Sequence, residues 1–328
     1  MSNIDVSVII PVFNVANYIE RCVRSLFEQT HSNMEYIFVD DCSPDQSMAI
    51  LHRLIEEYKD KNLSIQIITH EKNSGLPTAR NSGLKVASGE YVFHCDSDDW
   101  VEKDAMEKMV RSAQTNQADI VWCDWFLSFR TNERYMKQKG KETPIDCMKA
   151  MLSGRLKYNV WNKLVKRSLY VDNQVTFPDG FGMGEDMTMI RLFSYATKVC
   201  YLPAALYHYV QINASSFTKT TSDIHMLQVY FNANQTIEFV INRHGSELEE
   251  ELQFFKLNIK LPLLISNDVN SHRLWTEWYT DANRYINRNK MFSLRIRLLQ
   301  QAAAKGNFSI VKLHYYLVTK VVYGLIYK

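Results

Sequence analysis

The stretch His94-Cys95-Asp96-Ser97-Asp98-Asp99-Trp100 directly follows the apolar run Tyr91-Val92-Phe93. It predicts a short buried strand that ends in three carboxylates within four residues. Like charges this close oppose shared ionisation, so a cation is expected beside them. Hard carboxylate oxygens favour Mg²⁺ or Mn²⁺ over softer metals, and such ions commonly hold a diphosphate. The alternative is a solvated acidic turn that begins a helix, a role that Asp99 could fill alone.

The residues before this stretch alternate between strand and helix patterns. Short apolar runs predict buried strands, and apolar residues at helical spacing predict helices between them, the second with Ser43 as N-cap and Pro44 at its first position. Such alternation implies right-handed crossovers and a mostly parallel sheet. The strands are expected at residues 6–10, 36–39, 64–68 and 90–93, and the helices at 17–29 and from 43 onward.

Two acidic clusters fall at carboxyl ends of these strands. Asp40-Asp41 follows the second strand, and residues 96–99 follow the fourth. Ligands of open α/β sheets bind beyond these ends, so we expect the two clusters to converge on one site. Between them, Arg80 follows a glycine-bracketed helix start. Its planar guanidinium suits a phosphate or a carboxylate, whereas an isolated arginine on a helix would be an ordinary surface residue.

The composition is that of a globular protein with no bias toward nucleic acid. The chain has 328 residues, 46% of them hydrophobic and 23% charged, with a formal net charge of +2. This length allows one large or two modest domains. The six cysteines show no CxxC pair and no zinc-ligand spacing, which favours free thiols in a reducing compartment. The N-terminus has no basic and apolar signal-peptide pattern, so a cytoplasmic location is expected.

The middle of the chain supplies a second acidic site. Residues 118–126 predict a strand near the edge of the sheet, and the polar residues 130–145 predict a loop over the site. Glu185-Asp186 follows a segment with three glycines, at residues 180–184, and precedes an amphipathic run. This places the pair at a helix N-terminus, where the free N–H groups and the dipole stabilise negative charge by about 0.3–1 kcal/mol. The simplest interpretation is a helix cap.

Four motifs in this order resemble those of family 2 glycosyltransferases. They are Pro11-Val12-Phe13-Asn14, Val39 to Ser43, Asn73 to Asn81 and Asp96 to Trp100, and the likeness covers about residues 4 to 217. One departure is Cys42, where the family often has glycine. The resemblance implies the GT-A fold, a Rossmann-like α/β domain with a mostly parallel sheet flanked by helices. We expect this domain at residues 1–217 and a helical C-terminal extension at 218–328.

The resemblance also implies roles for single residues. Asp41 would meet the uracil edge, Asp96 the ribose, and Asp186 would be the catalytic base. Glu185 would support the turn or the acceptor, and the helix N-terminus would lower the pKa of Asp186. The full set of expected donor-binding residues is Pro11, Val12, Asn14, Asp40, Asp41, Arg80, Asp96, Ser97 and Lys163.

For the metal, the resemblance implies that Asp98 coordinates a divalent ion, Mn²⁺ or Mg²⁺. His208 could complete the metal shell, although lone histidines are more often structural. Lys163 could equally be a surface lysine beside Trp161. Ser216 is a further candidate contact to the diphosphate.

The function implied is a metal-dependent inverting glycosyltransferase. It would move a sugar from a nucleotide-sugar, a UDP-sugar by family preference, to a hydroxyl of a carbohydrate or lipid-linked acceptor, in surface polysaccharide or glycolipid assembly. One alternative is a nucleotidyltransferase, which would normally have a glycine-rich basic loop after the first strand, where residues 11–14 lack one. The other is a non-catalytic subunit that binds a nucleotide-sugar, for which a base such as Asp186 would serve no purpose.

The C-terminal end is basic. Residues 282–328 contain nine lysines or arginines and no acidic residue. The last stretch, residues 308–328, has the pattern of an amphipathic helix that lysines interrupt, which makes it a poor transmembrane span. It fits attachment to a membrane surface, at the inner face of the cell membrane. The alternative is a terminal helix docked on the protein's own core.

Overall fold

The computed structural model describes residues 4–138, 140, 143–213 and 223–318. The chain divides into two compact units, each built from two segments. The first contains Met1–Met148 and Tyr158–Asn232, and the second contains Lys149–Lys157 and Ala233–Lys328. The domain boundary expected at residue 217 lies outside the described residues, and the division between the units falls inside helix α8.

The first unit is an α/β domain, as predicted. Its strands are β1 (Val6–Val12), β2 (Met34–Asp40), β3 (Ser64–Thr69), β4 (Tyr91–His94), β5 (Trp100–Val101), β6 (Ile120–Ser128), β7 (Glu133–Met136), β8 (Lys163–Lys166) and β9 (Val199–Val210). Its helices are α1 (Ile19–Phe27), α2 (Ser47–Glu57), α3 (Leu76–Val86), α4 (Ala105–Asn116), α6 (Arg167–Val171) and α7 (Thr188–Tyr195). Helices α5 (Pro144–Leu152) and α8 (Asp223–His244) extend from this unit into the second.

Among the described residues, nine strands form one sheet in the order β3-β2-β1-β4-β8-β6-β9-β5, with β7 paired to β6. The four N-terminal strands are parallel, as their separation by helices predicts. Strand β8 enters antiparallel between β4 and β6, and β6 runs parallel to β9. Most paired residues of the sheet are therefore in parallel register.

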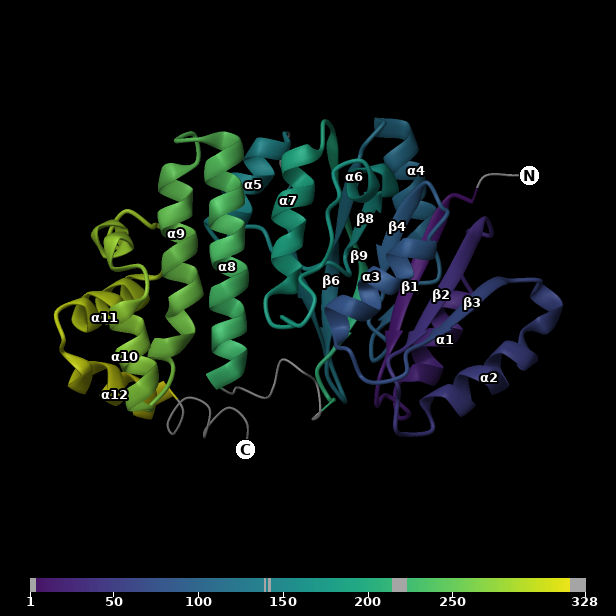
Figure 1. The fold of residues 1–328 in the computed structure, drawn as a ribbon, viewed down its shortest axis with the longest axis horizontal. Coiled ribbons are helices and arrows are strands. Elements are labelled where there is room, and N and C mark those ends of the chain that lie inside the picture. Colours follow the sequence, from purple (N-terminus) through teal and green to yellow (C-terminus); the bar gives the residue numbers. More distant parts are fainter. Residues whose placement is uncertain (1–3, 139, 141–142, 214–222, 319–328) are drawn as a thin grey trace. The chain divides into compact units, whose positions relative to one another are not determined.

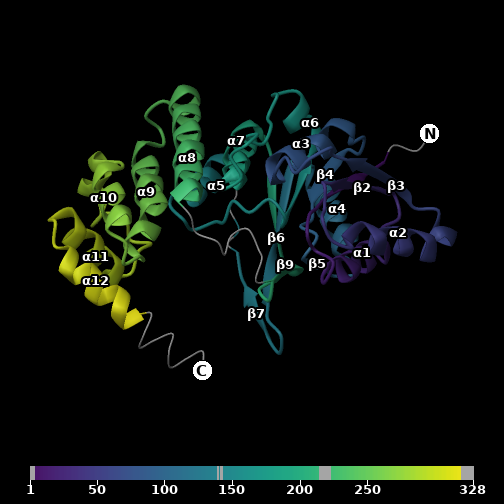
Figure 2. The ribbon, with the colours of Figure 1, turned by 60° about the horizontal axis from the view of Figure 1, so that its bottom comes forward.

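Helices cover both faces of this sheet (Figures 1 and 2). Helices α1, α2 and α4 pack on the face to which the side chains of Val6, Val8 and Ile10 point. Helix α3 packs on the other face, where a Cβ at Gly83 would approach Ile9 to 2.5 Å. Every residue of β1 and β2 is buried, whereas the edge strand β3 contains both exposed and partly buried residues. Burial on both faces explains why these central strands appear as continuous apolar runs in the sequence.

Three local predictions were wrong. Strand β6 is internal, because it pairs with both β8 and β9. Residues 130–145 contain β7, which forms a hairpin with β6, and the start of α5. Helix α2 begins at Ser47, where the carboxylate of Asp45 accepts the Ser47 N–H, while Ser43 accepts the N–H of Asn14. Ser43 therefore links two loops and does not cap the helix.

The second unit is helical, as expected of the C-terminal extension. It contains α9 (Glu249–Lys260), α10 (Val269–Glu277), α11 (Leu294–Ala304) and α12 (Phe308–Tyr316), with short 3₁₀ helices at Leu261–Leu264 and Thr280–Tyr285. The ammonium of Lys260 is buried in it, donates hydrogen bonds to the carbonyl of Trp278 and to Asn283, and lies 4.1 Å from the Trp275 ring. None of the helices within the described residues combines the length and the apolar character that a membrane crossing requires.

Candidate active site

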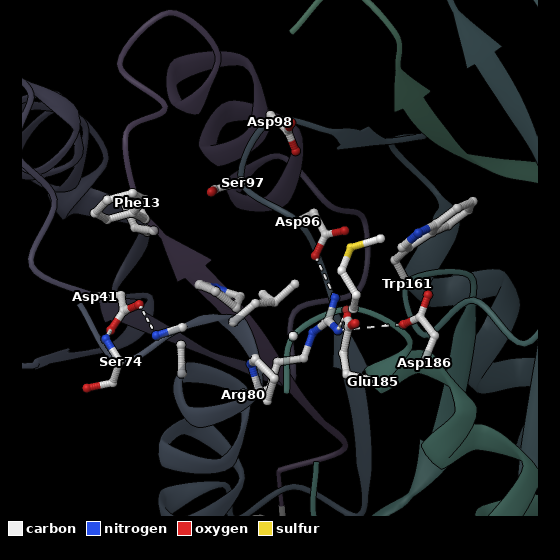
Figure 3. Close-up of a pocket in the computed structure, with 18 of the residues that line it drawn as sticks. Phe13, Asp41, Ser74, Arg80, Asp96, Ser97, Asp98, Trp161, Glu185 and Asp186 are labelled. Carbon is white, nitrogen blue, oxygen red and sulfur yellow. Dashed lines mark hydrogen bonds and ion pairs between the residues drawn. The ribbon is translucent and has the colours of Figure 1, made fainter. Parts of the chain in front are cut away.

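A cavity of about 810 Å³ opens at the carboxyl ends of the parallel strands (Figure 3). Its wall is formed by the loops after β1, β2 and β4, the start of α3, residues 158–161, the glycine segment 180–186, the end of β9 with Asn213 beyond it, and Gln228 of α8. This is the usual ligand position in open α/β sheets, and the volume suits a small organic ligand.

The structure brings most of the predicted site residues to this cavity. Asp41 lies at one end, Asp186 at the other, and Arg80 between them (Figure 3). The predicted residues that line the cavity are Pro11, Val12, Asn14, Asp41, Arg80, Asp96, Ser97, Asp98, Glu185 and Asp186. Asp40, Lys163 and His208 are not part of the lining.

Asp41 organises the loop that precedes α3. Its carboxylate accepts the N–H groups of Ser74 and Gly75, both at 2.8 Å, and lies 2.7 Å from Nδ1 of His70. Gly75 has φ of +89°, a conformation that favours glycine. A carboxylate offers about four acceptor positions, so one remains for a ligand in the cavity. The neighbouring Asp40 instead accepts the N–H of Ser43 and supports the turn at Cys42.

Arg80 connects three carboxylates at the centre of the cavity wall. Its side chain is 1% exposed; Nη2 donates to Asp96 and Nη1 to Glu185, each at 2.9 Å. The same Nη1 lies 3.6 Å from Asp186. The carboxylates come from the loop after β4 and from the glycine segment, which are remote in sequence. Arg80 is thus a bridge between the two acidic motifs, held by an ion-pair network.

The prediction that the helix N-terminus lowers the pKa of Asp186 was wrong. Glu185–Met187 form a 3₁₀ turn that leads into α7, so the position at a helix start is confirmed. However, burial raises the pKa of Asp186 to about 6, although Arg80 opposes the shift. Burial and the neighbouring Asp186 likewise raise the pKa of Glu185, to about 8. Burial is the largest cause of the shift of the Asp186 pKa, and Asp186 can accept a proton near neutral pH.

The first part of α8 fixes the glycine segment that carries these two carboxylates. Asn232, 4% exposed, donates 2.9 Å hydrogen bonds to the carbonyls of Phe181 and Met183. Gln228 accepts the N–H of Met183 at 3.1 Å, and the Phe231 ring stacks on Phe181 at 3.9 Å. This contribution of α8 was not predicted from the sequence. The available signal was two amide side chains spaced by four residues, which share one helix face.

The residue beside Asp98 is Asn213 and not His208, which was the expected second metal ligand. Asn213 donates to Asp98 at 2.8 Å from the end of β9. His208 stacks between Trp100 and Phe126, and its Nε2 and Nδ1 lie 2.9 and 2.8 Å from Glu102 and Glu133. The assignment of His208 to the metal therefore does not fit the structure.

Strand alternation explains this misplacement. Successive side chains of β9 point to opposite faces, so His208 points away from the face on which Tyr207 and Tyr209 stack against Trp161. Asp99 is also structural, since it accepts the Val210 N–H and the Tyr207 hydroxyl, and its pKa is raised by burial. The candidate Ser216 lies outside the described residues.

Lys163 lies inside the protein and not on its surface. It is 1% exposed and donates to the carbonyl of Asn159 and to the side chain of Asn162. Burial lowers its pKa to about 7, although the charge of Asp186 opposes the shift. Lys163 contacts the cavity residue Asn159 but does not itself line the cavity, so any influence on a donor would be indirect.

Comparison with known proteins agrees with the motifs. The family model described as glycosyl transferase family 2 matches residues 7–188. This chain belongs to that family. EpsJ of Bacillus subtilis, described as an uncharacterized glycosyltransferase, is 31% identical over 276 residues, which cover 80% of this chain and 77% of EpsJ. The chain is therefore a glycosyltransferase, and the predicted family is confirmed.

Two further relatives are informative. The poly(ribitol-phosphate) beta-glucosyltransferase of Bacillus spizizenii is 32% identical over 210 residues, 62% of this chain but 32% of that enzyme. The crystal structure of Staphylococcus aureus TarS residues 1–349 with UDP-GlcNAc superposes with a TM-score of 0.72 at 20% identity, over 95% of this chain and 91% of TarS 1–349. The likeness to TarS confirms the GT-A fold.

Proposed function

We propose that this glycosyltransferase moves a sugar from a UDP-sugar to an acceptor hydroxyl, with inversion and with the help of Mn²⁺ or Mg²⁺. One observation carries the proposal: one cavity holds Asp96 and Asp98 on one side and Asp186 on the other, with Arg80 between them. The related fold of TarS was crystallised with UDP-GlcNAc, which supports UDP as the nucleotide.

The donor would lie along the wall from Asp41 to Asp98. The remaining acceptor position of Asp41 suits an N–H of the base, and the Phe13 ring, 42% exposed, offers an apolar surface beside it. Asp96 uses Oδ1 for Arg80, and its side chain stays 23% exposed, so it can also accept a ribose hydroxyl. With the base and the ribose bound in this way, the diphosphate would lie near Asp98.

A divalent ion fits the donor set at Asp98. Within the described residues, no three His, Cys, Asp or Glu side chains gather into a complete metal site. Mg²⁺ needs few protein ligands, because it is usually bound by one or two carboxylates together with substrate phosphates. Asp98 would supply the carboxylate, and Asn213, already hydrogen-bonded to it, could turn its amide oxygen to the ion. When bound, the ion would neutralise charge that develops on the leaving diphosphate.

Asp186 would take the proton of the acceptor hydroxyl. Its side chain is 26% exposed in the cavity, and its raised pKa suits a base near neutral pH. Glu185, bound to Arg80, would hold the turn. Attack from the Asp186 side, opposite the diphosphate, would invert the anomeric carbon.

The acceptor side of the cavity suits a sugar ring. Trp161 and Tyr209 both line it, with ring centroids 5.3 Å apart. We therefore propose a carbohydrate or lipid-linked carbohydrate acceptor in surface polysaccharide or glycolipid assembly. A relative named for poly(ribitol-phosphate) supports a polymer of this kind. A cytoplasmic location stays a prediction.

Calorimetric titration with UDP, GDP and CDP, each with and without Mn²⁺, tests the donor side. Tight UDP binding that requires metal is expected, and D98N should remove the metal requirement together with most of the affinity. Asp186→Asn should bind UDP normally but lose transfer by at least about 100-fold, the usual contribution of a positioned base. D60N, at an exposed carboxylate outside the cavity, is the matched control. Equal binding of all three nucleotides, or a fully active D186N enzyme, would refute the assignment.

A further inference from the structure

The second unit exposes an unusual amount of apolar surface on two helices that pack against each other. Of the eighteen large hydrophobic side chains exposed among the described residues, seven fall within residues 291–317. Leu294 and Leu298 lie one turn apart on α11 and are 64% and 54% exposed. On α12 and at its C-cap residue Leu317, the exposed apolar residues are Ile310, Leu313, Tyr316 and Leu317.

These residues form the outer faces of their helices, because the opposite faces are buried within the second unit. On α11 the buried side chains are Leu299, Gln300, Ala302 and Ala303, and on α12 Val311 is fully buried. Helices α11 and α12 are neighbours in the fold (Figure 2). The spacing from Leu294 to Leu298, and from Ile310 through Leu313 to Leu317, is that of a single apolar stripe on each helix.

The exposed side chains in the same stretch of the chain are also basic. Lys290, Arg295, Lys305 and Lys312 are exposed and form no ion pair with any residue that the structure describes. Residues 282–328 contain no acidic side chain that could offset them. Exposed leucines together with exposed cations are complementary to a surface whose interior is apolar and whose outer layer carries negative charge.

We infer that the outer faces of α11 and α12, called the α11–α12 surface, bind a lipid bilayer that contains anionic lipids. A polar binding partner would leave the exposed leucines without apolar contacts. A wholly apolar partner would leave the charges of the lysines without counter-ions. Helices of 11 and 9 residues are too short to cross a bilayer, so they would lie in its interface. The inference rests on the proposed function in one respect, since a lipid-linked acceptor would make such attachment useful.

Co-sedimentation with vesicles tests this surface without any substrate. The full-length protein is mixed with phosphatidylcholine vesicles, with and without phosphatidylglycerol, at low and high salt. We expect binding only to the anionic vesicles, weakened by salt. The double variant Leu298→Glu, Leu313→Glu should bind at least about tenfold more weakly, because each leucine contributes apolar burial. Arg295→Gln and Lys312→Gln should each weaken binding about fivefold.

Val171→Glu, at a 55% exposed residue of α6, is the matched control and should bind like the native protein. All these positions are exposed and lie outside the cavity, so thermal unfolding and UDP-sugar hydrolysis should not change. Equal binding to both kinds of vesicle, or native binding by the double-leucine variant, would overturn the inference. So would light scattering that shows a dimer lost in that variant, since a second copy would then cover the surface. Absence of UDP-sugar turnover would refute the proposed function but leave the vesicle result standing.

Discussion

Replacing Arg80 by methionine tests the electrostatic centre of the site. The substitution removes a buried cation that lies within 2.9 Å of Asp96 and Glu185 and 3.6 Å of Asp186. Loss of one partner of a buried ion pair usually costs about 3–5 kcal/mol, because the remaining charge is uncompensated. Three carboxylates lose their partner here, so we expect a loss of free energy of unfolding at the upper end of that range.

The sign of the pH dependence follows from the pKa shifts. Burial raises the pKa of Asp186 to about 6 and that of Glu185 to about 8, and Arg80 opposes both shifts. A carboxyl group whose pKa is raised on folding is protonated more in the folded state, so stability falls as pH rises through the folded pKa. Without Arg80 both pKa values rise further. The destabilisation of R80M should therefore be larger above pH 8 than below pH 6.

Urea unfolding of the native protein and R80M at these two pH values measures this difference. If R80M retains transfer activity, the decrease of that activity at acidic pH should begin at a higher pH than in the native enzyme, because the pKa of Asp186 is higher. Arg80→Lys keeps the charge but cannot donate to two carboxylates in the same fork geometry. Its free energy of unfolding should therefore lie between those of the native protein and R80M. Arg24→Met, which removes a partly exposed arginine that pairs with Glu20 and Glu57, should change stability little. A pH-independent loss in R80M would refute the reasoning.

Three further predictions follow from other contacts. Asn232→Ala removes the donor from the part-buried carbonyls of Phe181 and Met183 and should lower transfer by about 10–100-fold with normal UDP affinity. Gln228→Ala should have a smaller effect, and an equal loss of UDP affinity in titration of the Asn232 variant would contradict a role confined to the glycine segment. Asp41→Asn should weaken UDP binding about tenfold or more and lower protection of the Ser74 amide in hydrogen exchange; unchanged binding would exclude it from the donor site. Gly89→Ala should lower the free energy of unfolding in urea by about 1–3 kcal/mol, because a Cβ would lie 2.6 Å from the Ser7 nitrogen; a neutral variant would show that this turn can relax.

The parts that could be predicted from sequence depend on neighbours in the chain. Buried parallel strands are continuous apolar runs, and their ends carry the acidic motifs. The first strand was therefore placed correctly at residues 6–10, although it continues through Pro11 to Val12, and residues 96–98 line the cavity as expected. The position of Glu185-Asp186 at a helix start followed from the preceding glycines; Gly184 adopts φ of +85°. These signals are local, and the family motifs add their order along the chain.

The parts that could not be predicted depend on contacts between distant segments. Nothing near His208 indicates that β9 turns it toward Glu102 and Glu133, because strand register is set by pairing with β6. The pKa of Asp186 depends on its burial and on the charges of Arg80 and Asp96, which come together only in the folded chain. The hydrogen bonds of Asn232 join residues about fifty positions apart, and the amide has no distinctive pattern around it.

Helix α8 runs unbroken from Asp223 to His244, and its first ten residues hold the segment that carries Glu185 and Asp186, the proposed catalytic pair. This determines where chimeric enzymes can be joined. A catalytic core cut after residue 217 and fused to a foreign C-terminal region would keep every family motif yet lose Gln228, Phe231 and Asn232. A junction after the Asn232 turn would retain them. Exchange of acceptor specificity among relatives should therefore succeed or fail according to which side of this helical turn the recombination point lies.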